Sequence, residues 1–536
     1  MGGAALFSVL VSSMILCDAF TYYKNQLLKH TPKDFKSIYE RKFAWNYGRE
    51  SDGFGRSVDI YGNKMLIGAC FSDMDDPDRK QAGSAHIYSL QNTERGWRYD
   101  SELWTNQTKA KDFFGWDVGL EQDIAIVGAW QHDDGFEDNG AVYFFQHMSH
   151  TSHYQSFWNM TAKVIGQGNY EFFGISVAFP PGAQYALVGA AGGSDNNGQN
   201  VGKAYIVGRT LRSWGISWEI KTELYPSSGS SFDYFGISVS VHDWISAVGA
   251  YGHNSGLGDI SGAVYIYSAE ESQDESNWEL QAKLVASDGK ANDFFGRAVA
   301  IYDTTLAVGA DGADDSGEKS GAVYMFTRTD TSRWSQSQKL IPASDNENEF
   351  FGGSVDIFND YMVIGADGDN HDEVRTGTAY FYKRSHYWDE MGAYDGEYWQ
   401  LVYQLYATDR SGRDLYGSDV AIYGESIIIG AEVGDGYDYN TGTAYVYTTP
   451  PDFHWLHSDW TAGGIAAVTI TSLVVVFGVA AVAYRRGMLD PIATRAGLTP
   501  QGGRLYRSDF DDSRRGPTAV RHVTIETTLW IRGVCV

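Results

Sequence analysis

The hydrophobic and polar positions of this chain follow a pattern that repeats about every sixty residues. Within one repeat, short runs rich in Val, Ile, Tyr and Ala alternate with turns rich in Gly, Asn and Asp. In the copy that begins at Gly296, this alternation predicts β-strands over residues 296–302, 305–310, 322–327 and 334–341. Each repeat is therefore predicted to form four short antiparallel strands.

Seven copies of this repeat align on a glycine that follows an aromatic residue. The anchor glycines are Gly55, Gly115, Gly174, Gly236, Gly296, Gly352 and Gly417. Each copy has a valine three residues later, continues to a Gly-Ala pair and closes on Gly-x-Ala/Val-Tyr, where the first copy carries His86 instead of tyrosine. Repeats of this length indicate either a linear solenoid or a β-propeller.

The count of strands favours a closed ring. Fourth-strand segments begin near six tryptophans, namely Trp97, Trp158, Trp218, Trp278, Trp334 and Trp399. No such segment follows the seventh copy, whereas residues 36–45 have a strand pattern and precede the first anchor. We expect that N-terminal strand to complete the last blade. The predicted fold is all-β: a seven-bladed β-propeller of four-stranded antiparallel blades over residues 36–447, with one C-terminal transmembrane helix.

Residues 462–484 form the predicted transmembrane helix. They are 23 consecutive residues without a charge, which as a helix would extend about 35 Å and cross a bilayer core. Arg485 and Arg486 follow directly, so the positive-inside rule places the tail, residues 485–536, in the cytoplasm. A buried soluble helix is the alternative. Residues 448–461 would be the juxtamembrane linker, and the composition of the tail indicates disorder.

Residues 1–19 have the pattern of a signal peptide, with an apolar stretch too short to span a membrane and small residues at Cys17 and Ala19. An uncleaved anchor is the alternative, and residues 20–35 form a lead-in to the propeller. Two N-glycosylation sequons, at Asn106 and Asn159, agree with an extracellular or lumenal body. The chain is therefore expected to be a single-pass type I protein of the plasma membrane, with an endomembrane location as the alternative.

Charge changes this picture in one respect. The chain has a net charge of -27, which argues against nucleic acid as a partner because phosphate recognition needs a basic surface. The tail carries 9 arginines and 5 acids, so the remainder has a net charge of -31. More than half of that charge falls in the seven loops that join the predicted second and third strands. One face of the propeller is therefore predicted to be strongly acidic.

The repeat resembles the FG-GAP repeat of integrin alpha subunits, on the strength of six Phe-Gly anchors, the Tyr416-Gly417 variant and the seven Gly-Ala pairs. The resemblance implies a propeller used for adhesion or ligand binding, often with calcium. The chain departs from integrins in three respects. The turns between its first two strands are too short for the family's calcium loops, leg domains are absent, and Tyr484-Arg485-Arg486-Gly487 does not match the membrane-proximal Gly-Phe-Phe-Lys-Arg motif. No integrin beta partner is therefore inferred.

Two interpretations of the acidic loops remain open. Several carboxylates in one short loop suit Ca²⁺, which prefers six to eight oxygen ligands. The candidate metal ligands are Asp133, Asp134, Asp138, Asp311, Asp314, Asp315, Asp367, Asp369 and Asp372. The alternative is that these acids form turns by binding their own backbone. For the acid that stands three residues before every anchor glycine, the turn-forming role is favoured, because all seven blades require it.

These observations predict a membrane-tethered adhesion or ligand-binding module, with an extracellular protein or glycan as ligand and the acidic face distal to the membrane. A lumenal trafficking or cell-wall-organising protein is the alternative. A hydrolase or lyase is disfavoured, since no catalytic motif is found and no catalytic cofactor is indicated. The spaced triplet His147, His150 and His153 is interpreted as a solvated loop rather than a zinc site.

Overall fold

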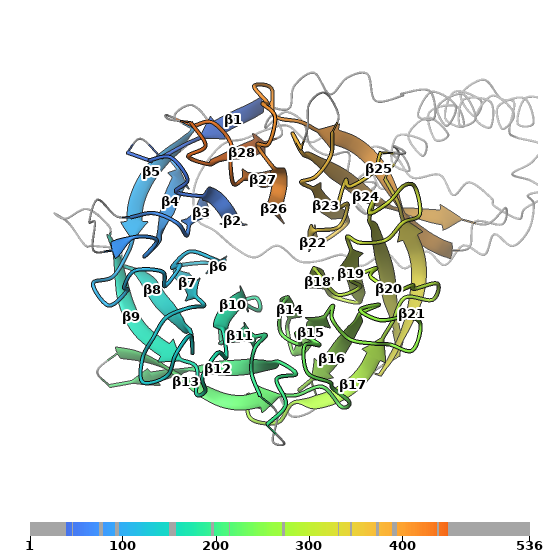
Figure 1. The fold of residues 1–536 in the computed structure, drawn as a ribbon, viewed down its shortest axis with the longest axis horizontal. Coiled ribbons are helices and arrows are strands. Elements are labelled where there is room, and N and C mark those ends of the chain that lie inside the picture. Colours follow the sequence, from blue (N-terminus) through green and yellow to red (C-terminus); the bar gives the residue numbers. More distant parts are fainter. Residues whose placement is uncertain are drawn as a thin grey trace, which may run out of the picture. The chain divides into compact units, whose positions relative to one another are not determined.

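The computed structural model describes residues 39–448, apart from 46, 74–78, 92–95, 149–156, 195–197, 214, 271–273, 331, 343–345, 371–374, 389–393 and 437–438. These residues form seven four-stranded antiparallel sheets around a common axis, the blades of a β-propeller (Figure 1). The predicted signal peptide, lead-in, linker, transmembrane helix and tail lie outside the described residues.

The strands follow the sequence repeat in order. Blade 1 contains β2 (Phe54–Tyr61), β3 (Lys64–Ala69), β4 (Ser84–Leu90) and β5 (Trp97–Leu103). Blade 2 contains β6 (Val118–Glu121), β7 (Ile124–Ala129), β8 (Ala141–Met148) and β9 (Phe157–Ile165). Blade 3 contains β10 (Phe173–Ala178), β11 (Tyr185–Ala190), β12 (Lys203–Arg212) and β13 (Gly215–Leu224). Blade 4 contains β14 (Val239–His242), β15 (Ile245–Ala250), β16 (Ala263–Ser268) and β17 (Glu279–Leu284).

The remaining blades continue in the same way. Blade 5 contains β18 (Val299–Tyr302), β19 (Thr305–Ala310), β20 (Ala322–Asp330) and β21 (Arg333–Leu340). Blade 6 contains β22 (Ser354–Phe358), β23 (Tyr361–Ala366), β24 (Thr378–Trp388) and β25 (Tyr394–Leu405). Blade 7 contains β26 (Tyr416–Tyr423), β27 (Ser426–Ala431), β28 (Thr443–Thr448) and, as its outer strand, β1 (Tyr39–Phe43).

The predicted closure of the ring is confirmed. β1 pairs antiparallel with β28, with Tyr39 opposite Thr448 and Phe43 opposite Ala444. The first and last described strands therefore share one sheet. Glu40 on β1 also accepts hydrogen bonds from the hydroxyl of Thr408 at 2.6 Å and from the hydroxyl of Tyr447 at 3.1 Å. Closure of this kind pairs β28 with an outer strand, so that blade 7 has four strands like the other blades and the ring leaves only short edges.

The anchor residues of the repeat lie where neighbouring blades meet. Gly68, from the Gly-Ala pair of blade 1, packs directly on the backbone of Gly115, the anchor of blade 2. Ser57 donates a hydrogen bond to the carbonyl of that same Gly115 at 3.0 Å. The aromatic residue before each anchor is buried against the third strand of its own blade, as in the pair Phe114 and Tyr143, whose ring centroids are 5.3 Å apart. The repeat is therefore an inter-blade contact motif.

The hydrophobic core is divided among the junctions between blades. One cluster joins Leu66 and Ile87 of blade 1 to Val118, Val127 and Tyr143 of blade 2, all buried. Sheets that pack face to face in this way bury both faces of their inner strands, which explains why the second strands are apolar at nearly every position.

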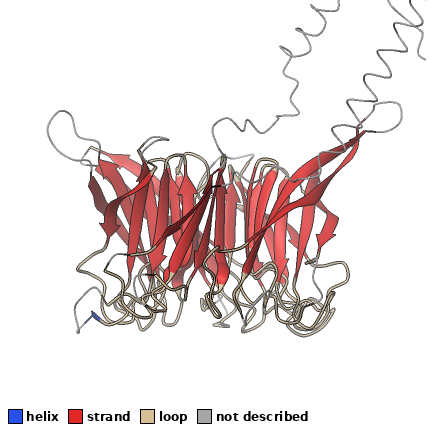
Figure 2. Cartoon of the chain, turned by 90° about the horizontal axis from the view of Figure 1, so that it is seen from above, coloured by secondary structure: helices blue, strands red, loops and turns tan. Residues whose placement is uncertain are grey.

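The two faces of the ring differ. Loops between second and third strands and connections between blades lie on one face, here called the loop face; the turns between first and second strands lie on the opposite turn face (Figure 2). Tyr39 begins β1 and Thr448 ends β28 at the turn face, because these antiparallel strands pair Tyr39 with Thr448. Both ends of the described chain therefore leave the propeller on the face opposite the long loops.

Candidate functional site

The carboxylates predicted to bind calcium lie on the loop face, where they bind their own protein. Asp133 accepts the backbone N–H of Asp138 at 2.7 Å, and Asp314 accepts that of Lys319 at 2.8 Å, five residues later in both loops. The donating N–H belongs in each case to a residue with positive φ. These aspartates therefore stabilise a left-handed turn, the turn-forming role considered for them.

Other candidate ligands pair with cations or hydroxyls. Asp134 forms an ion pair with Lys163 at 2.5 Å, and Asp315 forms one with Lys339 at 2.6 Å. Asp369 accepts a hydrogen bond from the Thr378 hydroxyl at 2.5 Å.

Asp311 lies 3.7 Å from the Arg297 guanidinium. Burial raises the pKa of Asp367, and the positive charge of Arg297 partly opposes that rise. Asp372 lies outside the described residues. Among the residues that the structure describes, no group of three or more His, Cys, Asp or Glu side chains is arranged to hold a metal ion. Calcium binding by these loops, which needs six to eight converging oxygens, stays a prediction.

The acid three residues before each anchor glycine is buried, and in six of the seven blades it accepts a backbone N–H that closes the connection between blades. Asp112 accepts the backbone N–H of Lys109 at 2.8 Å, and Asp293 accepts that of Lys290 at 2.8 Å, three residues earlier in both cases. Equivalent bonds are made by Asp52, Glu171, Asp233 and Asp414. The turn-forming role predicted for this position is therefore confirmed.

Two of these buried acids also bind a histidine, which sequence reasoning did not find. His132 lies 2.5 Å from Asp112, and His253 lies 2.6 Å from Asp233, measured from imidazole Nδ1 to carboxylate oxygen. Lys283 approaches Nε2 of His253 at 2.7 Å, so the ring accepts from the ammonium and donates to the carboxylate. Both histidines are buried, and they brace the loop face from inside. Of the predicted histidine triplet, His147 lies 3.3 Å from Asp123, and the other two lie outside the described residues.

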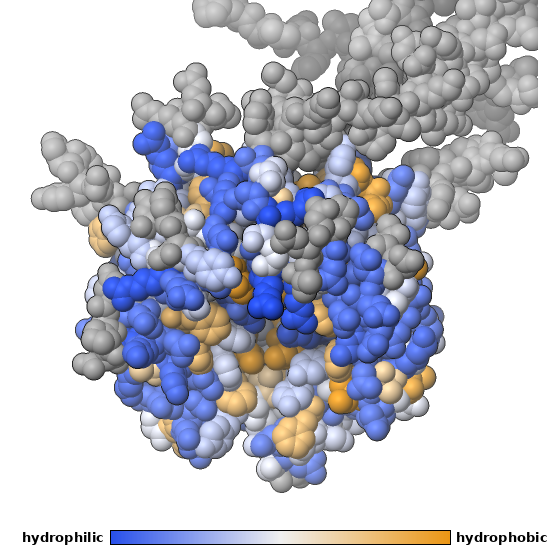
Figure 3. Space-filling model, turned by 45° about the horizontal axis from the view of Figure 1, so that its top comes forward, coloured by the Kyte–Doolittle hydropathy of each residue, from blue (hydrophilic) through white to orange (hydrophobic). Residues whose placement is uncertain are grey.

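The centre of the ring is an open channel of about 890 Å³, walled by the first strands of the blades. Figure 3 shows a largely hydrophilic surface with apolar side chains gathered near the centre of the ring. Four aspartates on or directly before these strands accept a hydrogen bond from the next blade. They are the acceptors in the pairs Asp59–Leu120 (2.6 Å), Asp117–Val177 (2.7 Å), Asp356–Ile422 (2.8 Å) and Asp419–Val58 (2.8 Å), with a backbone N–H as donor each time.

Burial changes the protonation of these aspartates. Loss of hydration raises the pKa of Asp117 and of Asp356 to about 7, and nearby Asp419 contributes to both shifts. The pKa of Asp419 rises to about 6 for the same reason, although Arg56 opposes the shift. The channel aspartates therefore connect neighbouring blades, and the charges of Asp117, Asp356 and Asp419 change near neutral pH.

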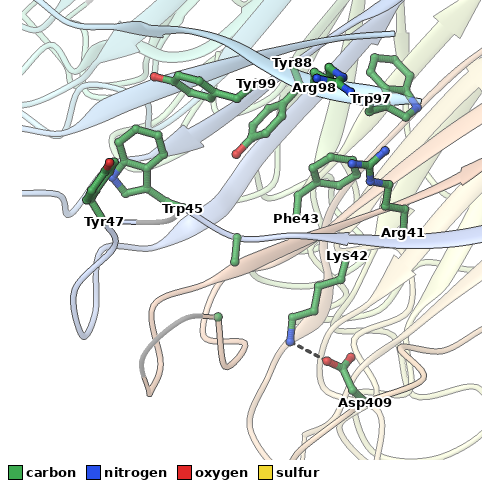
Figure 4. Close-up of a pocket in the computed structure, with 12 residues that line it drawn as sticks. Arg41, Lys42, Phe43, Trp45, Tyr47, Tyr88, Trp97, Arg98, Tyr99 and Asp409 are labelled. Carbon is green, nitrogen blue, oxygen red and sulfur yellow. Dashed lines mark hydrogen bonds and ion pairs between the residues drawn. The ribbon is translucent and has the colours of Figure 1, made fainter. Parts of the chain in front are cut away.

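A groove runs along the junction between blades 7 and 1. One cavity of about 960 Å³ lies between β1 and β5 and contains Trp45, Tyr88, Tyr99 and Arg98 in its wall. A second cavity, of about 660 Å³, shares Trp45, Tyr47 and Tyr99 with the first and continues to Asp73 and Trp104. Figure 4 shows Trp45, Tyr47 and Tyr99 at one end of the first cavity and Arg41 and Arg98 at the other. We call this combined surface the junction groove.

Both predicted sequons have accessible asparagines. Asn106 lies in an exposed turn and Asn159 lies on the exposed side of β9. Glycosylation at these sites stays a prediction. Among the described residues of 39–448, no helix has the length and apolarity needed to cross a membrane.

Comparison with known proteins identifies the family. The model of the FG-GAP repeat matches residues 41–88, 97–145, 218–267, 278–326, 334–382 and 399–447, together more than half of the chain. The chain belongs to the FG-GAP repeat family, as the sequence resemblance indicated. Each matched segment begins with the outer strand of one blade and ends with the third strand of the next. FG-GAP propellers are typically binding or structural modules.

The other comparisons add less. No curated protein matches this chain. Among solved structures, the crystal structure of the Saccharomyces cerevisiae Sqt1 is 10% identical, with a TM-score of 0.38, and the match covers 76% of this chain and 98% of that one.

Proposed function

We propose that this FG-GAP propeller is the ligand-binding part of a membrane-tethered adhesion protein of the cell surface. One observation carries the proposal: Tyr39 and Thr448 leave the ring on the turn face, opposite the long loops of all seven blades. A chain anchored through residues 462–484 would hold the turn face toward the membrane. The loop face would then point outward, free to meet an extracellular protein or glycan.

The construction of the loop face supports this proposal. Its connections are fixed by buried acids, and two are braced further by histidine, so the loops are held in defined positions. Binding surfaces gain affinity from such preorganisation because less conformational freedom is lost on binding. Exposed large side chains on these loops include Phe136, Phe232 and Tyr439. Aromatic residues of this kind often dominate interface energetics.

The experiment uses cells that express the full-length chain. Adhesion to immobilised extracellular material is compared among the unchanged chain, a chain with an epitope inserted at Gly256 on the loop face, and one with the same epitope at Gly62 on the turn face. Both glycines have positive φ and open space around them. Expression should increase adhesion, the Gly256 insertion should abolish the increase, and the Gly62 insertion should preserve it. Equal loss with both insertions, or no gain on expression, contradicts the proposal.

Calcium dependence remains a prediction and forms a second arm of the same assay. Chelation with EGTA during adhesion should reduce binding if any loop carboxylates gather around Ca²⁺ when ligand is present. Surface biotinylation of the same cells separates an adhesion protein from a lumenal trafficking or cell-wall-organising protein, because the lumenal protein would not be labelled on intact cells.

A further inference from the structure

The seven-fold repeat is broken at one junction, between blades 7 and 1. In four other blades, the hydroxyl of the tyrosine that closes Gly-x-Ala/Val-Tyr donates a hydrogen bond to the connection before its own blade. The Tyr265 hydroxyl, for example, donates to the carbonyl of Ser228 at 3.0 Å. Blade 1 has His86 at this position, and its ring lies 4.2 Å from that of Trp45 in the preceding connection.

The connection changes together with the third strand. Trp45 stands ten residues before its anchor glycine, where the other six repeats carry the smaller residues Thr105, Val164, Pro226, Ala286, Pro342 and Ala407. Trp45 thus contacts the smaller ring of His86. The centroid of its ring also lies 5.2 Å from that of Tyr99 and 5.6 Å from that of Tyr47. The two departures from the repeat occur together and form the aromatic end of the junction groove.

The aromatic rings of the groove remain accessible to solvent. Tyr47 is 75% exposed, Tyr99 is 45% exposed and Trp104 is 50% exposed. A pyranose ring presents flat apolar C–H faces between its hydroxyl groups, and these faces suit the electron-rich face of an aromatic ring. A row of partly exposed Trp and Tyr side chains in a groove therefore fits the stacking of successive sugar units.

The other end of the groove is cationic, against the charge of the whole propeller. Arg41 on β1 and Arg98 on β5 are both exposed and lie in the wall of the same cavity. Within the described part of the chain, neither guanidinium forms an ion pair, although this body carries a net charge of -31. Lys42 is instead engaged by Asp409 at 2.6 Å. The guanidinium of Arg41 lies 5.1 Å from the centre of the Phe43 ring, and both guanidinium groups are matched to carboxylates, which they bind with paired hydrogen bonds.

We propose that the junction groove binds an acidic oligosaccharide, whose sugar rings stack on Tyr47, Tyr99 and Trp104 and whose carboxylates pair with Arg41 and Arg98. This inference deepens the proposed function, because it names the ligand class of a binding module.

Other occupants fit the groove less well. The segment 20–38, which contains the lead-in and precedes β1, carries four lysines and one aspartate, so the two arginines repel it. A proline-rich peptide would use the aromatic rings but leave both guanidinium groups without a partner.

The test measures binding of the purified full-length chain in detergent to oligogalacturonates, with neutral cello-oligosaccharides as the comparison. We expect saturable binding to the acidic series that weakens with added salt, and weaker binding to the neutral series. Arg41→Gln combined with Arg98→Gln should lower the affinity at least about tenfold, the usual effect of losing charge-assisted hydrogen bonds. Tyr99→Ala should lower the affinity for both series, because it removes a stacking face.

Matched controls keep the result interpretable. Phe157→Ala removes an aromatic ring of the same exposure as Tyr99, 45%, from the start of β9 in blade 2 and should leave oligogalacturonate binding unchanged. The variants change exposed side chains, and unchanged thermal unfolding verifies the fold.

The inference is overturned if the chain does not bind oligogalacturonates, if the double arginine variant binds as before, or if a proline-rich peptide or single-stranded RNA competes for the groove. It is also overturned if binding appears only after residues 20–38 are removed, since the groove would then hold the chain's own lead-in. An intact groove with no effect of the Gly256 insertion on adhesion would contradict the proposed loop-face function alone.

Discussion

Substitution of Gly68 by alanine should destabilise the propeller strongly, although alanine is the most conservative change for a glycine. A Cβ added at Gly68 would lie closer than 3.0 Å to the backbone carbonyl of Gly115 in the next blade. Because the obstacle is a backbone carbonyl, the distance between the two blades must increase. Overpacking of this kind costs about 1–3 kcal/mol, and a backbone obstacle places the cost toward the upper end.

Two further glycines separate the causes. Gly182 has φ +86 and open space around it, so Gly182→Ala carries only the cost of a left-handed backbone, about 1–2 kcal/mol. Gly115 has φ +89, and a Cβ there would also meet the carbonyl of Ser84 in the preceding blade. Gly115→Ala therefore combines both costs, about 3–5 kcal/mol.

The assay is unfolding of the full-length chain and its three variants in one detergent, followed by tryptophan fluorescence against urea. The midpoints should fall in the order Gly182→Ala, Gly68→Ala, Gly115→Ala, with the last variant lowest. If Gly68→Ala unfolds at the same urea concentration as the unchanged chain, the claim that the repeat glycines set inter-blade contact is refuted. Equal effects of Gly115→Ala and Gly182→Ala would show that backbone conformation alone explains the anchor.

Three other predictions address the channel, the closing strand and the loops. The pKa of Asp117 in the folded protein, about 7, lies above its value in the unfolded chain. The contribution of Asp117 to stability is therefore complete below about pH 4 and is lost as pH rises through 7. The melting temperature of the unchanged chain relative to that of Asp117→Asn should fall between pH 5 and pH 8, and a constant difference would contradict this. Glu40→Ala should destabilise the ring by about 1–3 kcal/mol in urea unfolding, because it removes the acceptor for two hydroxyls from the closing strand; an unchanged midpoint would show that closure does not need it. Asp314→Ala should lower the melting temperature equally with and without EGTA, since its carboxylate holds a loop N–H; a loss seen only in calcium would assign it to metal binding instead.

The sequence predicted the ring because the residues that build it recur in every blade. The anchor glycines and the aromatic residues before them have the same contacts each time, so their spacing alone defined the blades. The closing strand was found by counting, because residues 36–45 were the only strand pattern left to complete the seventh sheet.

The site was less predictable, for physical reasons. The channel aspartates occupy two different repeat positions, Asp59 and Asp356 at one and Asp117 and Asp419 at the other, so a repeat alignment does not bring them together. The substitution of His86 for tyrosine was visible in the sequence. Its partner Trp45 lies in a connection of variable sequence, and only the ring closure places that connection beside blade 1.

The loop acids show a related ambiguity. Their clustering was visible, but a carboxylate that binds a backbone N–H and one that binds a cation have the same sequence signature. Asp133 and Asp314 are distinguished only by the donor five residues later, which depends on the local backbone conformation.

The most direct test of the proposed orientation is epitope accessibility in cells that express the full-length chain. One epitope is inserted at Gly256 on the loop face, and a second is placed after Val536 at the C-terminus. Antibody should stain the Gly256 epitope on intact cells, whereas the C-terminal epitope should be stained only after permeabilisation. Staining of the C-terminal epitope on intact cells, or of the Gly256 epitope only after permeabilisation, would contradict an outward-facing adhesion module.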